Sequence, residues 1–108
     1  MTNADRVLDA LGDPTRRRVF KRLRAGARSV GEIAEGMDVT RPAVSQHLAV
    51  LKAAHLVTHR AEGTRRFYVV DPRGIEAIRD WLDGFWSHTL AAFKAAAERE
   101  SIKEKKPS

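Results

Sequence analysis

Residues 29–56 read SVGEIAEGMDVTRPAVSQHLAVLKAAHL, and this stretch carries the start signals of two short helices joined by a tight turn. Ser29 and Glu32 have the S-x-x-E spacing of a capping box, which starts a helix over about 30–37. Thr40 can cap a second helix over about 40–54, and Pro42 is tolerated in its first turn because amides there have no helical partner. Two short helices around such a turn predict a helix-turn-helix motif.

The second helix is expected to bury one face and to present the other to a ligand. Val44, Leu48 and Leu51 occur at i, i+4 and i+7, which places them on one buried stripe. Polar residues fall largely on the other faces, where they can reach base edges or phosphates in a major groove. The candidate DNA-binding residues here are Thr40, Arg41, Pro42, Ala43, Ser45, Gln46, His47 and Lys52. An ordinary solvated surface helix is the alternative at this point, and His47 can also hydrogen-bond its own scaffold.

Residues 56–70 are predicted to form a β-hairpin, because apolar residues alternate on both sides of a turn that contains Gly63. Arg60, Arg65 and Arg66 flank this turn, where arginine can follow the DNA backbone or enter a narrow minor groove. We therefore interpret residues 58–70 as a wing, with a solvated turn as the alternative. Arg65 and Arg66 are adjacent on a strand, so their side chains point to opposite faces and cannot reach DNA in the same way.

Outside this central region the pattern is helical. A short amphipathic helix is expected over 3–11, and Asp13-Pro14 caps a second helix that Gly26 closes. Asp71-Pro72 starts a last helix that runs to about Glu100. The predicted fold is mainly α with a small hairpin, in the order α-α-α-α-β-β-α, as in a winged helix-turn-helix.

Length and composition limit the remaining possibilities. The chain has 108 residues, so we expect one domain over 1–100 and a flexible tail over 101–108. It has no cysteine, which excludes disulfides and thiolate metal sites. We find no signal-peptide core and no apolar run long enough to span a bilayer, so a cytoplasmic location is expected, with no membrane contact.

The charge is localised. Thirteen basic and seven acidic residues lie up to Val70, and seven of each follow, so the formal net charge of +6 belongs to the first part of the chain. A localised positive field indicates a polyanionic partner, of which double-stranded DNA is the commonest. Arg16 and Arg17 are further candidate phosphate contacts, although they could equally form a solvated face of their helix.

The last helix carries more apolar surface than one small core needs. Two tryptophans and two phenylalanines fall on it, which favours a partner surface, with packing on its own domain as the alternative. Together with the first helix it predicts a homodimer. The candidate interface residues are Val7, Leu8, Leu11, Ile78, Trp81, Leu82, Phe85, Trp86, Leu90 and Phe93.

Four stretches together resemble the arsenic-repressor (ArsR) family of bacterial winged-helix regulators: residues 8–17, 30–34, 41–57 and 62–68. The resemblance extends over about Leu8 to Phe93. It implies a homodimeric transcription repressor that is usually released from operator DNA by an effector. A two-fold dimer in turn predicts a palindromic operator. One departure is His55, which stands where family members often have glycine before Leu-Val.

The metal-sensing branch of the family is disfavoured. The predicted third helix, 30–37, has neither cysteine nor histidine, and the last helix has only His88 and no Asp-x-His pair. The residues therefore resemble the cysteine-free branch, with no cofactor, no metal site and an unknown effector. Alternatives are a repressor with an unrecognised metal or small-ligand site and a winged helix used for protein contact. No motif of an enzyme is present.

Overall fold

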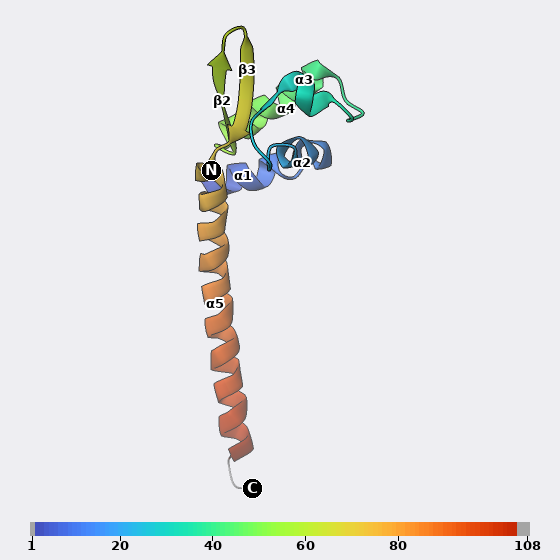
Figure 1. Ribbon diagram of the computed structural model, residues 1–108. Helices are drawn as coiled ribbons and strands as arrows, with labels where there is room; N and C mark the ends of the chain where they lie inside the picture. The colour runs from blue at the N-terminus through green and yellow to red at the C-terminus, as the bar shows by residue number, and fades with distance from the viewer. Residues whose placement is uncertain (1, 106–108) are drawn as a thin grey trace. The chain divides into compact units, whose positions relative to one another are not determined.

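The computed structural model describes residues 2–105, which form five helices and three strands (Figure 1). In chain order they are α1 (Asn3–Ala10), α2 (Pro14–Lys21), β1 (Arg28–Ser29), α3 (Val30–Ala34), α4 (Arg41–Ala53), β2 (Val57–Glu62), β3 (Arg65–Val70) and α5 (Pro72–Lys105). This mainly helical architecture with a small sheet confirms the predicted fold class.

Strand β1 is missing from the predicted order. It is only two residues long, so no alternation of apolar residues can reveal it. It exists because β3 pairs with it, Arg28 opposite Tyr68 and Ser29 opposite Phe67, which gives an antiparallel sheet of order β1-β3-β2. The turn of the hairpin is also shorter than expected, because Ala61 and Glu62, which we assigned to the turn, belong to β2 and pair with β3.

The chain forms two compact units that divide after Ile78. The first contains α1 to β3 with the start of α5, and the second contains the rest of α5. The expected single domain over 1–100 stays a prediction. The expected tail over 101–108 is also helical as far as Lys105, because a run rich in good helix formers continues past Glu100. The last three residues of that expected tail lie outside the described residues.

The helix starts follow the predicted signals. Asp13 accepts a hydrogen bond from the Arg16 amide and caps α2, and Thr40 accepts one from the Ala43 amide and caps α4. Two helices end earlier than predicted: α2 at Lys21 rather than near Gly26, and α3 at Ala34, because Glu35 is already extended.

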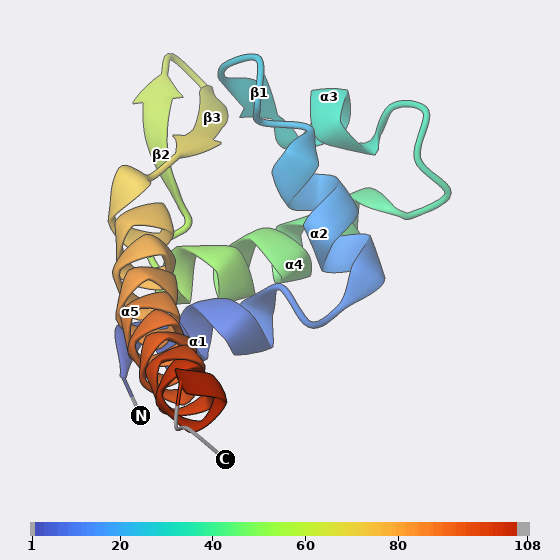
Figure 2. The ribbon, with the colours of Figure 1, turned by 90° about the horizontal axis from the view of Figure 1, so that it is seen from below.

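Helix α4 lies at the centre of the first unit. Helices α1, α2 and α3 pack against it, as Figure 2 shows for α1 and α2. The buried apolar residues of the core are Val7, Ala10, Val19, Leu23, Ile33, Val44, Leu48, Leu51, Ala54, Leu56, Val57 and Tyr68. Val7 has no exposed surface, and Leu11 and Ile78 are half-buried against this core. Val7 is therefore excluded from the predicted dimer surface, because its whole side chain is used within its own chain.

Helix α4 ends at the residue that departs from the family pattern. His55 has a φ of 58°, in the left-handed region that favours glycine. Its amide donates to the Lys52 carbonyl, and the Leu56 amide donates to the Leu51 carbonyl, which are the two hydrogen bonds of a Schellman cap. The His55 carbonyl then accepts the Gly74 amide at 2.8 Å, where a Cβ on Gly74 would lie 2.7 Å from that oxygen. The corner before β2 thus holds the first turn of α5.

Replacing His55 with glycine should stabilise the fold. The left-handed conformation costs a non-glycine residue about 1 kcal/mol, and glycine removes that strain at this cap. We expect His55→Gly to raise the free energy of unfolding by about 0.5–1 kcal/mol in urea titrations followed by circular dichroism. The matched variant His55→Ala keeps the strain and should not stabilise; equal gains from both variants would contradict this account.

Candidate nucleic-acid interface

Helix α4 divides as predicted into a buried and an exposed face. Val44, Leu48 and Leu51 have no exposed surface. The predicted residues Arg41, Pro42, Ser45, Gln46 and Lys52 are exposed, as are Ala49, Val50 and Ala53, and Ala43 is half-buried. The Arg41 guanidinium lies against Gly31 of α3, where a Cβ would come within 3.1 Å of Nη2. The absence of a side chain at Gly31 therefore gives Arg41 its place beside α3.

His47 lies on the scaffold side of α4. It is half-buried, and its charge acts on Asp13, the N-cap of α2. The pKa of Asp13 is lowered first by the hydrogen bond from the Arg16 amide, then by the charges of Arg16 and His47. The structure thus places His47 beside the start of α2 rather than among the exposed residues of α4.

The wing is the β2–β3 hairpin, which turns at Gly63 with a φ of 61°. Its arginines have different surroundings. Arg60 pairs with Glu62 of the same strand at 3.1 Å, and both side chains are more than half exposed. Arg66 is exposed and forms no ion pair with any described residue. Arg66 is therefore the wing cation most available to a phosphate.

Arg65 is instead attached to the helix-turn-helix. Its Nη2 donates to the Ser29 hydroxyl at 3.3 Å and lies 3.8 Å from the Glu32 carboxylate. Its guanidinium also lies over the Phe67 ring, 5.0 Å from the centroid. Ser29 and Glu32 are the two residues of the capping box of α3, so Arg65 joins the wing to the start of α3. Alternation along the strand predicted that the two arginines differ, but not this attachment.

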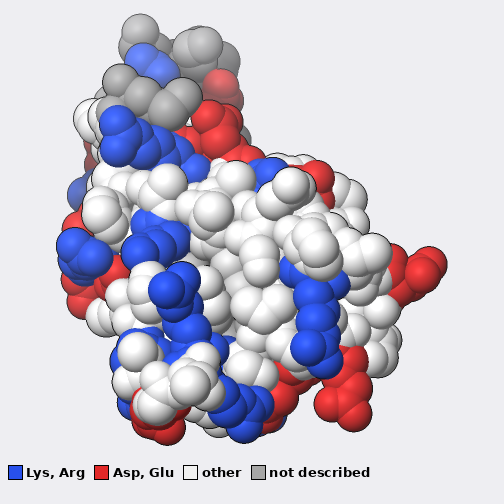
Figure 3. Space-filling model, turned by 90° about the horizontal axis from the view of Figure 1, so that it is seen from above, with Lys and Arg blue, Asp and Glu red and all other residues white. Residues whose placement is uncertain are grey.

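These elements border an open groove between the wing and α3. Its volume is about 530 Å³, and it is lined by residues that include Glu35, Arg41, Thr64 and Arg66. Figure 3 shows several groups of basic side chains on the face seen from above, with most acidic side chains toward its rim. The interface thus combines a cationic wing with the exposed amino-terminal part of α4.

His59 of β2 was not among the candidate site residues. Its ring lies 5.5 Å from that of Tyr68, and its Nδ1 is buried without a hydrogen-bond partner among the described residues. Burial lowers its pKa, and the charges of Lys52 and Arg66 lower it further. The charges of Lys52 on α4 and Arg66 on the wing therefore both act on the His59 imidazole. Sequence spacing does not show that these residues are close together.

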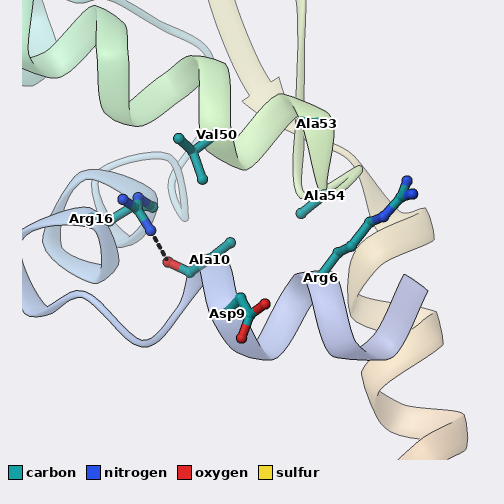
Figure 4. Close-up of a pocket in the computed structure, with 7 residues that line it drawn as sticks. All are labelled: Arg6, Asp9, Ala10, Arg16, Val50, Ala53 and Ala54. Carbon is teal, nitrogen blue, oxygen red and sulfur yellow. Dashed lines mark hydrogen bonds between the residues drawn. The ribbon is translucent and has the colours of Figure 1, made fainter. Parts of the chain in front are cut away.

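Arg16 and Arg17 contact α1. Arg16 Nη1 donates to the Ala10 carbonyl at 3.2 Å, as Figure 4 shows, and Arg17 Nη1 donates to the Leu11 carbonyl at 2.6 Å. Both guanidiniums are thus used at the carboxyl end of α1, where cations are favoured by the helix dipole. This gives the pair a structural role, and their phosphate contact stays a prediction.

Comparisons with known proteins agree with this geometry. Residues 11–60 match the family model described as a helix-turn-helix domain. The chain is 49% identical over 96 residues to the HTH-type transcriptional regulator Rv2034 of Mycobacterium tuberculosis, covering 89% of this chain and 90% of that protein. It is also 30% identical over 79 residues to the transcriptional repressor SdpR of Bacillus subtilis, covering 73% and 88%.

Solved structures that resemble this chain are also transcriptional regulators. The chain resembles a possible transcriptional regulator for arsenical resistance, with a TM-score of 0.68, 39% identity and coverage of 83% of this chain and 94% of that one. It also resembles an ArsR-like transcriptional regulator from Rhodococcus sp. RHA1, with a TM-score of 0.72, 26% identity and coverage of 88% and 92%. This chain belongs to the ArsR family. It is a DNA-binding transcriptional regulator of the winged helix-turn-helix type.

The described part of this ArsR-family chain contains no group of three or more His, Asp or Glu residues placed to hold a metal ion. None of its described helices is both long and apolar enough to cross a bilayer.

Titration of Glu32 provides a test of the Arg65 attachment. The hydrogen bond from the Ser29 amide, followed by the Ser29 hydroxyl and the charge of Arg65, lowers the pKa of Glu32 below its ordinary 4.5. Because the folded-state pKa is lowered, the stabilisation is present above pH 4.5 and is lost as the pH falls through the folded-state pKa. In carboxyl-detected NMR titrations, Arg65→Gln should raise the pKa of Glu32 part of the way back. The matched variant Arg66→Gln should leave it unchanged, and equal shifts in both would contradict the attachment.

Proposed function

We propose that this regulator is a homodimeric repressor that binds a palindromic operator through α4 and the wing. The observation that carries the proposal is the exposed polar face of α4 beside a cationic wing, on a chain 49% identical to a transcriptional regulator along most of its length. The named repressors among its relatives, SdpR and the HTH-type transcriptional repressor SmtB of Mycobacterium tuberculosis, favour repression. Occlusion of polymerase at the operator is the simplest route to it.

The residues divide into two groups by what they can contact. Arg41, Ser45 and Gln46 are exposed in the first turns of α4, where side chains reach base edges, and a glutamine can pair with both edge groups of adenine. Lys52 and Arg66 supply phosphate contacts that set affinity, with Arg60 as a further contact once it leaves Glu62. The remaining residues at the start of α4, Thr40, Pro42 and Ala43, bring its positive end to a phosphate.

The second unit supplies the dimer surface. Its apolar side chains are exposed within one chain, from 43% for Trp81 to 69% for Phe93, and this is far more than a monomer leaves open in one stripe. The members of this stripe are Trp81, Leu82, Phe85, Trp86, Leu90 and Phe93. Leu8 of α1 is also exposed, at 42%. A second copy of the chain is the partner with a matching stripe. A two-fold axis then places the two α4 helices in successive major grooves about 34 Å apart.

The proposal implies a binding role rather than a catalytic one, as for the regulators that it resembles. It also implies that the protein works where the chromosome is, in the cytoplasm.

Operator binding tests the two residue groups. In fluorescence anisotropy with the chain's own upstream DNA at about 0.15 M salt, Gln46→Ala should lose discrimination at one base pair per half-site, by about 1–3 kcal/mol. Lys52→Ala should weaken operator and scrambled duplexes alike, and should lower the slope of log affinity against log salt by about one per protomer. Equal losses from both variants on both duplexes would contradict the assignment. Wild-type binding that does not distinguish the duplexes would favour the protein-contact alternative.

A charge in the aromatic stripe should break the dimer. Phe85 is 60% exposed in one chain and stacks on Trp81 with centroids 5.7 Å apart, so it is central to the proposed interface. Burying a carboxylate in both copies should weaken dimerisation of Phe85→Glu at least about 100-fold in sedimentation equilibrium. The control Ser87→Glu adds the same charge about 160° away around the helix. If Ser87→Glu dissociates the protein as strongly, or if the wild type is a monomer, the interface is wrong.

A further inference from the structure

A pocket of about 270 Å³ lies between α1 and the carboxyl-terminal half of α4, away from the wing (Figure 4). Its wall is apolar. Ala10 comes from α1, Val50 and Ala53 come from the carboxyl-terminal half of α4, one and two helical turns after Gln46, and Ala54 is the cap that ends the helix. Val50 is 41% exposed there, so an apolar side chain lines an open concavity.

Two cations stand at the ends of this pocket. Figure 4 shows Arg16 at one end and Arg6 at the other, while the Asp9 carboxylate points away from α4 in this view. Arg16 uses Nη1 for the Ala10 carbonyl at 3.2 Å, but its Nε is buried with no hydrogen-bond partner among the described residues. A buried donor on a charged group is costly when unpaired, and a carboxylate is the acceptor that suits a guanidinium best.

We infer that this pocket binds a small apolar monocarboxylate, with its carboxylate on Arg16 and its apolar body over Val50. The volume lies just below the 300–1,000 Å³ of ordinary small-molecule sites, so the ligand is compact, such as one aromatic ring or a short branched chain. Leu8, the α1 residue of the proposed dimer surface, projects about 160° around the helix axis from Arg6 at the pocket.

Such a ligand would regulate DNA binding, and this part of the inference rests on the proposed function. Val50 follows Gln46 by one helical turn, so a ligand on Val50 contacts the helix that reads the bases. It separates α4 from α1, and its carboxylate neutralises the charge of Arg16, which lowers the positive charge of the unit that must attract phosphates. The ligand therefore weakens operator binding, and by linkage operator DNA weakens ligand binding by the same factor.

Calorimetric titration with benzoate tests the site, with benzamide as its uncharged counterpart of the same shape. We expect a benzoate dissociation constant of about 1 mM or tighter, and at least ten-fold weaker binding of benzamide. Arg16→Gln removes the charge, and Val50→Phe fills the pocket while keeping Arg16, so each should weaken benzoate binding at least about ten-fold. Arg17→Gln, which alters the neighbouring arginine on the same helix, is the control and should bind within about two-fold of the wild type.

Three results would overturn the site: no benzoate binding at 10 mM ligand, about ten times the expected constant, equal affinity for benzoate and benzamide, or unchanged binding in both pocket variants. A change of oligomeric state in Val50→Phe would assign the pocket to contact between copies instead. Operator anisotropy with and without benzoate tests the regulation, with an expected loss of affinity of at least five-fold. Operator binding that benzoate does not change would reject the regulation alone, whereas no operator binding without ligand would reject the proposed function.

Discussion

Burial of the Val44, Leu48 and Leu51 stripe is the constraint on which the rest of the first unit depends. All three side chains are completely enclosed, and α1, α2 and α3 pack against the helix that carries them. Because one face of α4 is fixed so firmly, its opposite face is fixed as well, and Arg41, Ser45 and Gln46 have defined directions before any DNA arrives. The base contacts that we propose for these residues therefore depend on the core as much as on the surface.

The residues at the two ends of α4 connect this helix to its neighbouring elements. At the start, the Thr40 hydroxyl ends the turn after α3, and Gly31 leaves room for the Arg41 guanidinium. At the other end, the left-handed His55 closes the helix and accepts the amide of Gly74, so the same corner begins both the wing and α5. Helix α4, the wing and the start of α5 thus share one junction.

The sequence predicted correctly those features that depend on residues close together in the chain. Capping residues, helix prolines and the apolar stripe of α4 act within four residues of one another, so Asp13, Ser29 and Thr40 could be identified with their roles. It failed where the deciding partner is distant. Strand β1 exists only because β3 pairs with it, Arg65 turns to a serine 36 residues away, and Val7 is enclosed by a core that no spacing on α1 reveals.

Ser29 takes part in three structures at once: it pairs with Phe67 in the sheet, caps α3 and accepts a hydrogen bond from Arg65. For protein engineering this makes residues 29–70 a single exchangeable block. A chimera that receives only the α4 of another regulator keeps a wing that is attached to its own α3. The new α4 and the wing then have a relative orientation that neither parent protein has, and we expect them not to fit the same DNA together. Exchanging Ser29, α3, α4 and the β2–β3 hairpin together keeps the relative positions of the elements that we propose to contact DNA.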